Sequence, residues 1–188
     1  MPCLALRVTY VGELGWELYC PSEFGGALWD TLWNAGRAHG LVPGGYRAID
    51  SLRLEKGYRA WGSDITPDDN PWEAGLGFAV KLDKEHFIGK NALVETQDHT
   101  TRKLGCLVLD DPLSAATGSE PVRIDGVIAG RVTSGGYGYT VERSIAYAYV
   151  PSGADLGQRV EVSLFGEWMG AEIVSEPLYD PKGLRIRS

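Results

Sequence analysis

Cysteine is scarce in this chain, and long apolar runs are absent. The 188 residues include three cysteines, Cys3, Cys20 and Cys106, which lie far apart and form no CxxC pair. An odd and scattered set excludes a disulfide framework. No apolar run approaches the ~20 residues that a membrane-spanning helix requires, and the start MPCLALRV lacks the features of a signal peptide. We therefore expect a cytoplasmic protein without a membrane partner.

Basic side chains are outnumbered and dispersed. Eighteen Lys and Arg residues face 25 Asp and Glu residues, for a net charge of −7. Because nucleic-acid binding requires clustered basic residues, we expect no nucleic-acid partner. His39, His86 and His99 show no ligand spacing with carboxylates or cysteines, so we expect no metal site. The motifs GxSxG, HExxH and GxGxxG and the P-loop are also absent, which excludes the enzyme classes that depend on them.

What the chain has instead is an ordinary globular composition, with 44% hydrophobic and 23% charged residues. Residues 1–97 carry mixed helix and strand patterns, which predict an α+β domain. The expected elements are a hairpin over 4–19, a helix after Pro21 with Ser22 as its cap, a helix over 47–56, a strand over 78–82 and a short helix beginning near Lys90.

Two groups of side chains in this first part have simple interpretations. Trp29 and Trp33 lie one helical turn apart, and we expect both to pack in the core. Arg53, Lys56 and Arg59 form a small basic concentration, which is most simply a solvated face.

A polar stretch over 98–103 separates this part from a C-terminal part with a different residue pattern. Short apolar segments recur after it, and turn signals such as Asp125-Gly126 and Gly166-Glu167 separate them. The pattern predicts an all-β domain over 98–188, a small antiparallel barrel. The glycine-rich SGGYGYT lacks the lysine and the following helix of a phosphate loop, and we interpret it as a glycine-bent strand connection. The expected strands cover 104–109, 122–124, 127–132, 145–150, 160–165 and 168–174.

One carboxylate stands out in the N-terminal hairpin. Leu6, Val8 and Tyr10 share one side of the first strand. If the strands close symmetrically around the loop Gly12–Gly15, Glu17 lies opposite Tyr10 on this apolar side. The pattern therefore predicts a sheltered glutamate beside a tyrosine.

Two explanations of this pair are open on the residues alone. Glu17 can form a structural ion pair with a buried Arg or Lys. Alternatively, its two coplanar oxygens can accept the paired N–H donors of a heterocyclic ligand, as they accept those of arginine. Tyr10 would then stack on the flat ring of that ligand.

Several ordered motifs resemble the glycine-cleavage T-protein superfamily of folate-dependent aminomethyltransferases. The resemblance is strong to the folate-binding region of sarcosine and dimethylglycine dehydrogenases, and it spans nearly the whole chain. The motifs that carry it are YVGELGWELY, DSLRLEKGYRAWGSDI, NPWEAGLGFAVKL, FIGKNAL and TSGGYGY.

The resemblance implies a fold and a ligand. The expected fold is a partial ferredoxin-like α+β unit, half of the aminomethyltransferase folate-binding fold, followed by a small antiparallel Greek-key β-barrel. The expected ligand is tetrahydrofolate, which receives a one-carbon unit to form methylenetetrahydrofolate from an N-methyl amine. Tyr10 and Glu17 match the family's pterin-contacting residues, and Phe78 matches an aromatic that lines the folate site. FAD is expected only in an absent N-terminal domain or a partner.

Two departures limit what the resemblance implies. The arginine that precedes the family's Asp-Ser-Leu-Arg-Leu-Glu motif is Ile49 here, and the role is not carried over to Arg47. The family's catalytic aspartate lies in an N-terminal segment without a counterpart in this sequence, so no catalytic residue is assigned. Asp64, Asp68 and Asp69 are expected to be solvent-exposed caps.

Two functions follow from these expectations. The first is the tetrahydrofolate-binding portion of a one-carbon transfer enzyme, which would need the missing N-terminal half or a flavin subunit as its partner. The alternative is a non-catalytic folate-binding or assembly module. Exposed apolar residues in the hairpin also predict a homodimer.

Overall fold

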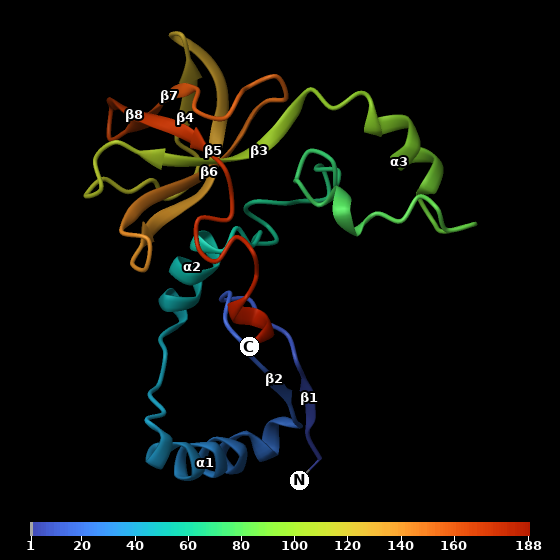
Figure 1. Cartoon of the computed structure of the whole chain (residues 1–188), viewed down its shortest axis with the longest axis vertical. Coiled ribbons are helices and arrows are strands. Elements are labelled where there is room, and N and C mark those ends of the chain that lie inside the picture. Colours follow the sequence, from blue (N-terminus) through green and yellow to red (C-terminus); the bar gives the residue numbers. More distant parts are fainter. Residues whose placement is uncertain (1) are drawn as a thin grey trace.

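The computed structural model describes residues 2–188, which form a β-barrel at one end of the molecule and an elongated N-terminal part at the other (Figure 1). The helices are α1 (Gly25–Gly36), α2 (Tyr46–Glu55) and α3 (Lys90–Gln97), and 3-10 turns cover Ser22–Phe24, Arg37–His39, Gly77–Ala79 and Arg185–Arg187. The strands are β1 (Leu4–Leu6), β2 (Glu17–Tyr19), β3 (Arg102–Leu109), β4 (Pro121–Ile124), β5 (Val127–Gly138), β6 (Arg143–Pro151), β7 (Arg159–Leu164) and β8 (Glu167–Val174).

The barrel is closed and antiparallel, with strand order β3-β6-β5-β4-β7-β8. Strands β4, β5 and β6 follow one another as neighbours, and β7 returns to lie beside β4, which is a Greek-key connection. All six expected strands are present. The predicted fold class, α+β elements followed by a small antiparallel barrel, is confirmed.

Apolar residues on both faces of the barrel wall explain its stability. Along β7, the alternate residues Val160, Val162 and Leu164 are buried inside the barrel. Strand β6 is buried on both faces, because α2 covers its outer face and brings Leu54 against Tyr147. Full burial of side chains of this size stabilises by about 1.5–3 kcal/mol each.

The glycine-rich motif lies inside a strand and does not connect strands. Ser134 to Gly138 form the last part of β5 and pair with β6. A Cβ at Gly135 would lie 2.5 Å from the carbonyl oxygen of Ala116, so the glycine permits the loop before β4 to pack on the strand. The expectation of a bent connection is therefore wrong in its location.

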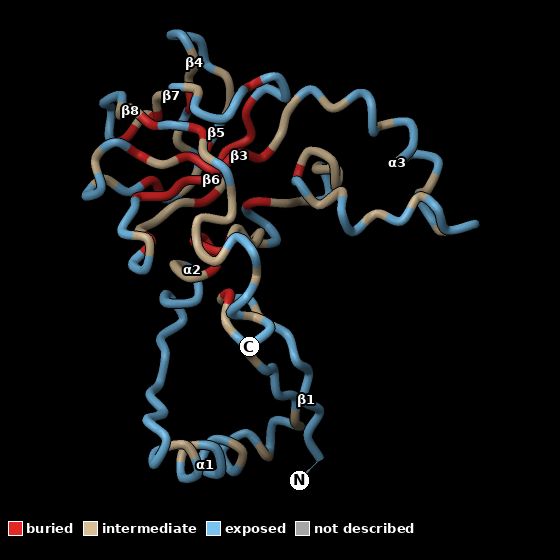
Figure 2. Tube along the Cα trace, viewed as in Figure 1, coloured by how far each residue is buried: buried red, intermediate tan, exposed pale blue. Residues whose placement is uncertain are grey.

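The N-terminal part is thin and almost entirely exposed (Figure 2). The strands β1 and β2 form a ribbon of two strands, and every residue in them is exposed. Trp29 and Trp33 stack on each other, with ring centroids 6.1 Å apart, and Trp29 remains 58% exposed. The expectation that both tryptophans pack in the core is wrong: Trp33 is only half-buried, and the two rings line a surface hollow with Leu41, Val42 and Pro43.

Two local predictions also fail. The expected strand over 78–82 is a 3-10 turn, in which the Val80 amide donates to the carbonyl of Gly77 (3.0 Å). A Cβ at Gly77 would lie 2.8 Å from the Trp72 ring, so the chain there is set by packing on that ring. Ser22 does not cap the following helix, since it lies inside a 3-10 turn that precedes α1.

Candidate functional site

The predicted hairpin forms, but its strands pair in another register. Leu6 lies opposite Glu17 in the β1–β2 ladder, at the place predicted for Tyr10. The chain leaves the ladder early, because the Val8 amide donates to the Leu6 carbonyl (3.1 Å) in a tight turn. The loop between the strands is therefore longer than the two glycines indicate.

A second turn holds this loop against the end of α2. The Thr9 hydroxyl accepts hydrogen bonds from the amides of Val11 (3.3 Å) and Gly12 (3.1 Å). Gly12 has φ +80°, and a Cβ there would lie 2.9 Å from the Lys56 side chain, so this contact requires glycine.

Tyr10 is fixed by the segment that follows α2. Its hydroxyl donates to the carbonyl oxygen of Arg59 (2.9 Å), and its ring stacks on Tyr58 with centroids 6.0 Å apart and planes inclined by 10°. Partial burial raises the pKa of the Tyr10 phenol above its ordinary value. The side chain therefore presents a neutral, rigid ring with its polar atom already satisfied.

Glu17 has no basic partner among residues 2–188, so the structural ion pair is not observed. The Tyr19 hydroxyl donates to Glu17 Oε2, and this bond raises the pKa of the Tyr19 phenol. Glu17 itself is exposed. The predicted shelter is thus wrong for the described residues, because the ribbon that carries Glu17 is uncovered.

Tyr10 and Glu17 nevertheless meet at one pocket of about 530 Å³. The loop and β2 form one wall of this pocket, and the start of α2 forms the other. Tyr46, Ile49 and Asp50 come from α2. Ile49, which stands at the sequence position of the family's arginine, contributes an apolar side chain to this wall beside the acidic Asp50. We call this the hairpin pocket.

Phe78 does not line the hairpin pocket. It is 77% exposed and borders a different hollow of about 470 Å³, to which Lys182 and Arg187 also contribute. Tyr58 borders this second hollow and stacks on Tyr10, so the segment after α2 lies between the two. The folate-lining roles of Tyr10, Glu17 and Phe78 stay predictions.

Asp64 is not the solvent-exposed cap that its loop position predicts. It is 1% exposed, and Arg53 Nη1 donates to its carboxylate at 2.5 Å. The hydroxyls of Thr133 and Ser134 also donate to it, both at 2.6 Å, as does the amide of Ala60 (2.9 Å). This carboxylate joins α2, the following loop and β5. Asp68 is exposed as expected, whereas Asp69 is half-buried and pairs with Arg102.

The other basic residues of this region are paired as well, so the expectation of a solvated face is wrong. The Lys56 ammonium donates to the Asp180 carboxylate (2.9 Å) and lowers the pKa of that carboxyl. Arg59 pairs with Glu176 through both terminal nitrogens. These contacts attach the C-terminal segment to the end of α2. The only sequence signal was the high density of charged residues in LRLEKGYR. That density does not show which residues, distant in the sequence, pair with them.

Two family models match this chain. The GCVT N-terminal domain matches residues 1–84, and the glycine cleavage T-protein C-terminal barrel domain matches residues 102–180. The chain belongs to the glycine-cleavage T-protein superfamily. The resemblance seen in the motifs is confirmed.

Relatives align with 95–100% of the chain. Dimethylglycine dehydrogenase of Rattus norvegicus is 43% identical over 190 residues, which are 100% of this chain and 22% of that protein. Aminomethyltransferase of Symbiobacterium thermophilum is 42% identical, over 95% of this chain and 48% of that protein. The crystal structure of aminomethyltransferase T from Bartonella henselae superposes with a TM-score of 0.87 at 30% identity, over 95% of this chain and 50% of that one.

The chain thus spans about one-fifth of the dehydrogenase and about half of the aminomethyltransferases. It corresponds to an aminomethyltransferase-type region of these relatives. The rat relative is named as mitochondrial, and the cytoplasmic location of this chain stays a prediction. Within residues 2–188, the helices are too short or too polar to cross a bilayer.

Proposed function

We propose that the hairpin pocket binds the pterin ring of tetrahydrofolate, and that the chain is the folate-binding portion of a one-carbon transfer enzyme. The observation that carries this proposal is a carboxylate without a basic partner at a pocket that also contains a fixed aromatic ring. Membership of the superfamily supports it, because aminomethyltransferases are folate-dependent in general.

The donor and acceptor pattern of Glu17 fits a pterin. A carboxylate offers about four lone-pair sites, and the Tyr19 hydroxyl occupies one of them. Oε1 remains free to accept from an N–H edge, and Oε2 keeps a second lone pair. Tyr10 is held in place by Tyr58 and by the Arg59 carbonyl, so its ring is oriented before a ligand arrives.

Bound tetrahydrofolate supplies the nitrogen atoms that accept the one-carbon unit. The residues of this chain bind and orient it, and Ile49 and Tyr46 line one side of the pocket. Orientation of this kind contributes up to about 7–11 kcal/mol to such reactions. The group that manages protons at the folate nitrogens is not assigned to a residue of this chain.

The exposed apolar ribbon favours a second candidate, a non-catalytic folate-binding or assembly module. Leu4 on β1 is 59% exposed, and exposed apolar side chains of this kind are typical of a strand that binds a partner. We propose that this partner is the family's N-terminal half, a flavin subunit or a second copy of the chain. Formation of methylenetetrahydrofolate from an N-methyl amine by the assembled protein would favour the enzyme, and binding without turnover would favour the module.

Replacing Glu17 tests the proposed ligand. We expect tetrahydrofolate to bind the wild-type chain and Glu17→Gln to weaken binding about tenfold or more, since a charge-assisted hydrogen bond contributes about 1.5–3 kcal/mol. Isothermal titration calorimetry gives the dissociation constants. The stability of the variant should not change, because Glu17 is exposed.

Glu95 on α3 provides the matched control. It is exposed, and it does not line the hairpin pocket. Glu95→Gln should bind tetrahydrofolate as the wild type does. If both variants bind equally well, Glu17 does not hold the ligand and the assignment fails.

A further inference from the structure

The register of the β1–β2 ribbon places two cysteines opposite each other at its open end. The outermost rung of the ladder pairs Leu4 with Tyr19. In an antiparallel pair, the next rung joins the residue before Leu4 to the residue after Tyr19, and these are Cys3 and Cys20. This end of the ribbon lies near the start of α1 (Figure 1). The long separation of the two cysteines in the sequence hides their proximity, because it depends on how the strands pair.

The distance across such a rung suits a disulfide bond. Residues directly opposite each other in an antiparallel pair have Cβ atoms about 4.5–5.5 Å apart. A disulfide requires about 3.5–4.5 Å between these atoms, so a small approach of the strand ends is sufficient. Cys3 is exposed, and its Sγ lies 3.9 Å from the carbonyl oxygen of Leu4. A thiol is a weak donor, so this contact does not prevent the side chain from turning toward Cys20.

The backbone does not hold the open end together beyond this rung. Pro2 precedes Cys3, and Pro21 follows Cys20. Proline has no amide hydrogen, so neither residue can donate a further ladder hydrogen bond. After Pro21 the chain turns away from the ribbon, since the Phe24 amide donates to the Pro21 carbonyl (2.9 Å). A covalent bond between the cysteines would therefore close an end that the ladder leaves open.

The cysteine pair lies on the opposite face of the ribbon from Glu17. Side chains alternate along a strand, so Glu17 and Tyr19 share one face and Cys20 lies on the other. On the first of these faces, the Tyr19 hydroxyl donates to the Glu17 carboxylate. Neither Cys3 nor Cys20 lines the hairpin pocket. A bond between them would leave that pocket open.

The third cysteine of the chain does not compete for an oxidant. Cys106 lies on β3 and is 1% exposed. Burial raises the pKa of its thiol to about 12, so the reactive thiolate is scarce at neutral pH. Cys20 is half-buried and Cys3 is exposed. An oxidant that reaches the folded chain therefore meets the ribbon pair first.

We propose that Cys3 and Cys20 form a reversible cross-strand disulfide that clamps the ribbon. The oxidant is a small-molecule disulfide such as oxidised glutathione. One cysteine thiolate attacks it and releases one glutathione, and the other cysteine thiolate attacks the mixed disulfide and releases the second. The protein thiols lose two electrons, and their two protons pass to the two glutathione thiolates.

The bond matters because a ribbon of two strands is marginal by itself. In the oxidised chain the register is fixed at the open end, whereas in the reduced chain the strands are free to separate and to pair elsewhere. One reversible bond of this kind differs from the framework of several disulfides that the composition excludes. The inference does not rest on the proposed function.

The test is equilibration of the full chain with reduced and oxidised glutathione, followed by acid quenching and peptide mapping by mass spectrometry. We expect an intramolecular link between Cys3 and Cys20, with the loss of both thiol hydrogens. The link should form with an effective thiol concentration at least about tenfold higher in the folded chain than in urea, because the unfolded loop must close at random. Cys106→Ala in both samples keeps the third thiol out of the unfolded reference.

Moving one thiol by a single residue supplies the matched control. In the double variant Cys3→Ser and Leu4→Cys, the thiol lies on the other face of the ribbon, since a shift of one residue reverses the face. Leu4 is 59% exposed, so the change disturbs no core. This variant should form glutathione adducts and show no gain on folding. Equal effective concentrations in the folded and unfolded wild-type pair, equal linkage in the shifted variant, or links between chains instead would each overturn the proposal.

Discussion

At the scale of single residues, the buried Asp64 connects the two parts of the molecule. Its carboxylate receives hydrogen bonds from Arg53 on α2 and from Thr133 and Ser134 on β5. These donors come from the motifs LRLEKGYRAWGSD and TSGGYGY, which are distant in the sequence. A buried charge of this kind is stable only while all of its partners are present.

Asp64→Asn should therefore destabilise the chain strongly. The substitution removes the negative charge and leaves the guanidinium of Arg53, which is itself buried, with only a long contact of 3.8 Å to Asp50. Breaking a buried ion pair in this way costs about 3–5 kcal/mol. Urea unfolding followed by circular dichroism measures the change.

Asp68 in the same loop is the control. It is exposed, so Asp68→Asn should change the free energy of unfolding by no more than about 0.5 kcal/mol. A similar small change for Asp64→Asn would mean that the network does not hold α2 on the barrel.

The contrast between Asp64 and Glu17 shows what a sequence reveals about single side chains. Glu17 was noticeable because it interrupts an apolar alternation, which is a local signal. Asp64 lies in an irregular acidic loop, where a surface position is the usual expectation. Its burial depends on Arg53 and Ser134, whose proximity arises only when α2 packs on β5.

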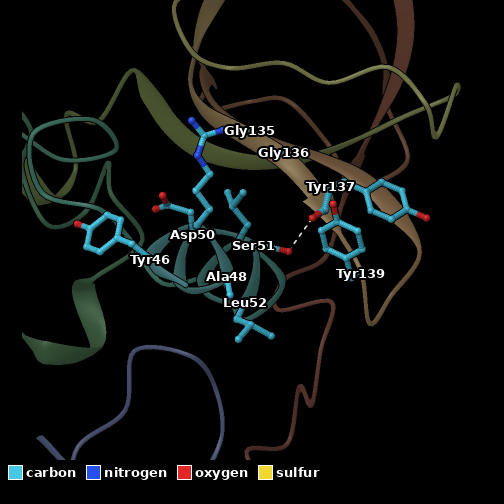
Figure 3. Close-up of a pocket in the computed structure, with 11 residues that line it drawn as sticks. Tyr46, Ala48, Asp50, Ser51, Leu52, Gly135, Gly136, Tyr137 and Tyr139 are labelled. Carbon is cyan, nitrogen blue, oxygen red and sulfur yellow. Dashed lines mark hydrogen bonds between the residues drawn. The ribbon is translucent and has the colours of Figure 1, made fainter. Parts of the chain in front are cut away.

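At the scale of elements, β5 contains glycines at positions where a neighbouring backbone segment lies too close for a side chain. A Cβ built on Gly130 would lie 1.8 Å from the carbonyl oxygen of Tyr149 on β6. This strand also carries Tyr137, whose carbonyl oxygen accepts the Ser51 hydroxyl of α2 (Figure 3), so its geometry helps to place that helix.

Gly130→Ala should therefore destabilise the barrel. The backbone of β6 cannot move aside as a flexible side chain can, and overpacking of this kind costs about 1–3 kcal/mol or more. We expect a lower urea midpoint. Gly153 provides the control, because it is exposed and a Cβ there would meet nothing within 4 Å. Equal urea midpoints for Gly130→Ala and Gly153→Ala would show that β5 and β6 accommodate the extra methyl group without a loss of stability.

The barrel strands could be predicted because each carries an apolar pattern of its own, as Val160, Val162 and Leu164 do on β7. The register of the hairpin could not. It depends on a side-chain turn at Thr9 and on the contact of Gly12 with Lys56, which lies far away in the sequence. The segment 78–82 looked like a strand by composition, but no other strand lies beside it in residues 2–188.

At the scale of the whole molecule, the two ends differ in how much apolar surface they bury. The barrel has a continuous core, whereas no residue of the ribbon or of α1 is buried. A ribbon of two strands is marginal by itself, and both of its edges are free to pair. Leu4, Leu6 and Val8 expose apolar surface on the same part of the chain. These features favour association through the ribbon.

We expect the isolated chain to self-associate as its concentration rises, with an elution volume in size-exclusion chromatography that shifts toward the dimer. The double substitution Leu4→Lys and Val8→Lys should return it to a monomer, because like charges would meet across the new interface and the apolar surface would be smaller.

Leu113 on the barrel is 92% exposed and provides the control. Leu113→Lys should associate as the wild type does if the ribbon is the contact. A chain that elutes as a monomer at every concentration would show that exposed strands alone do not drive pairing. A dimer that is lost in the Leu113 variant instead would place the contact on the barrel.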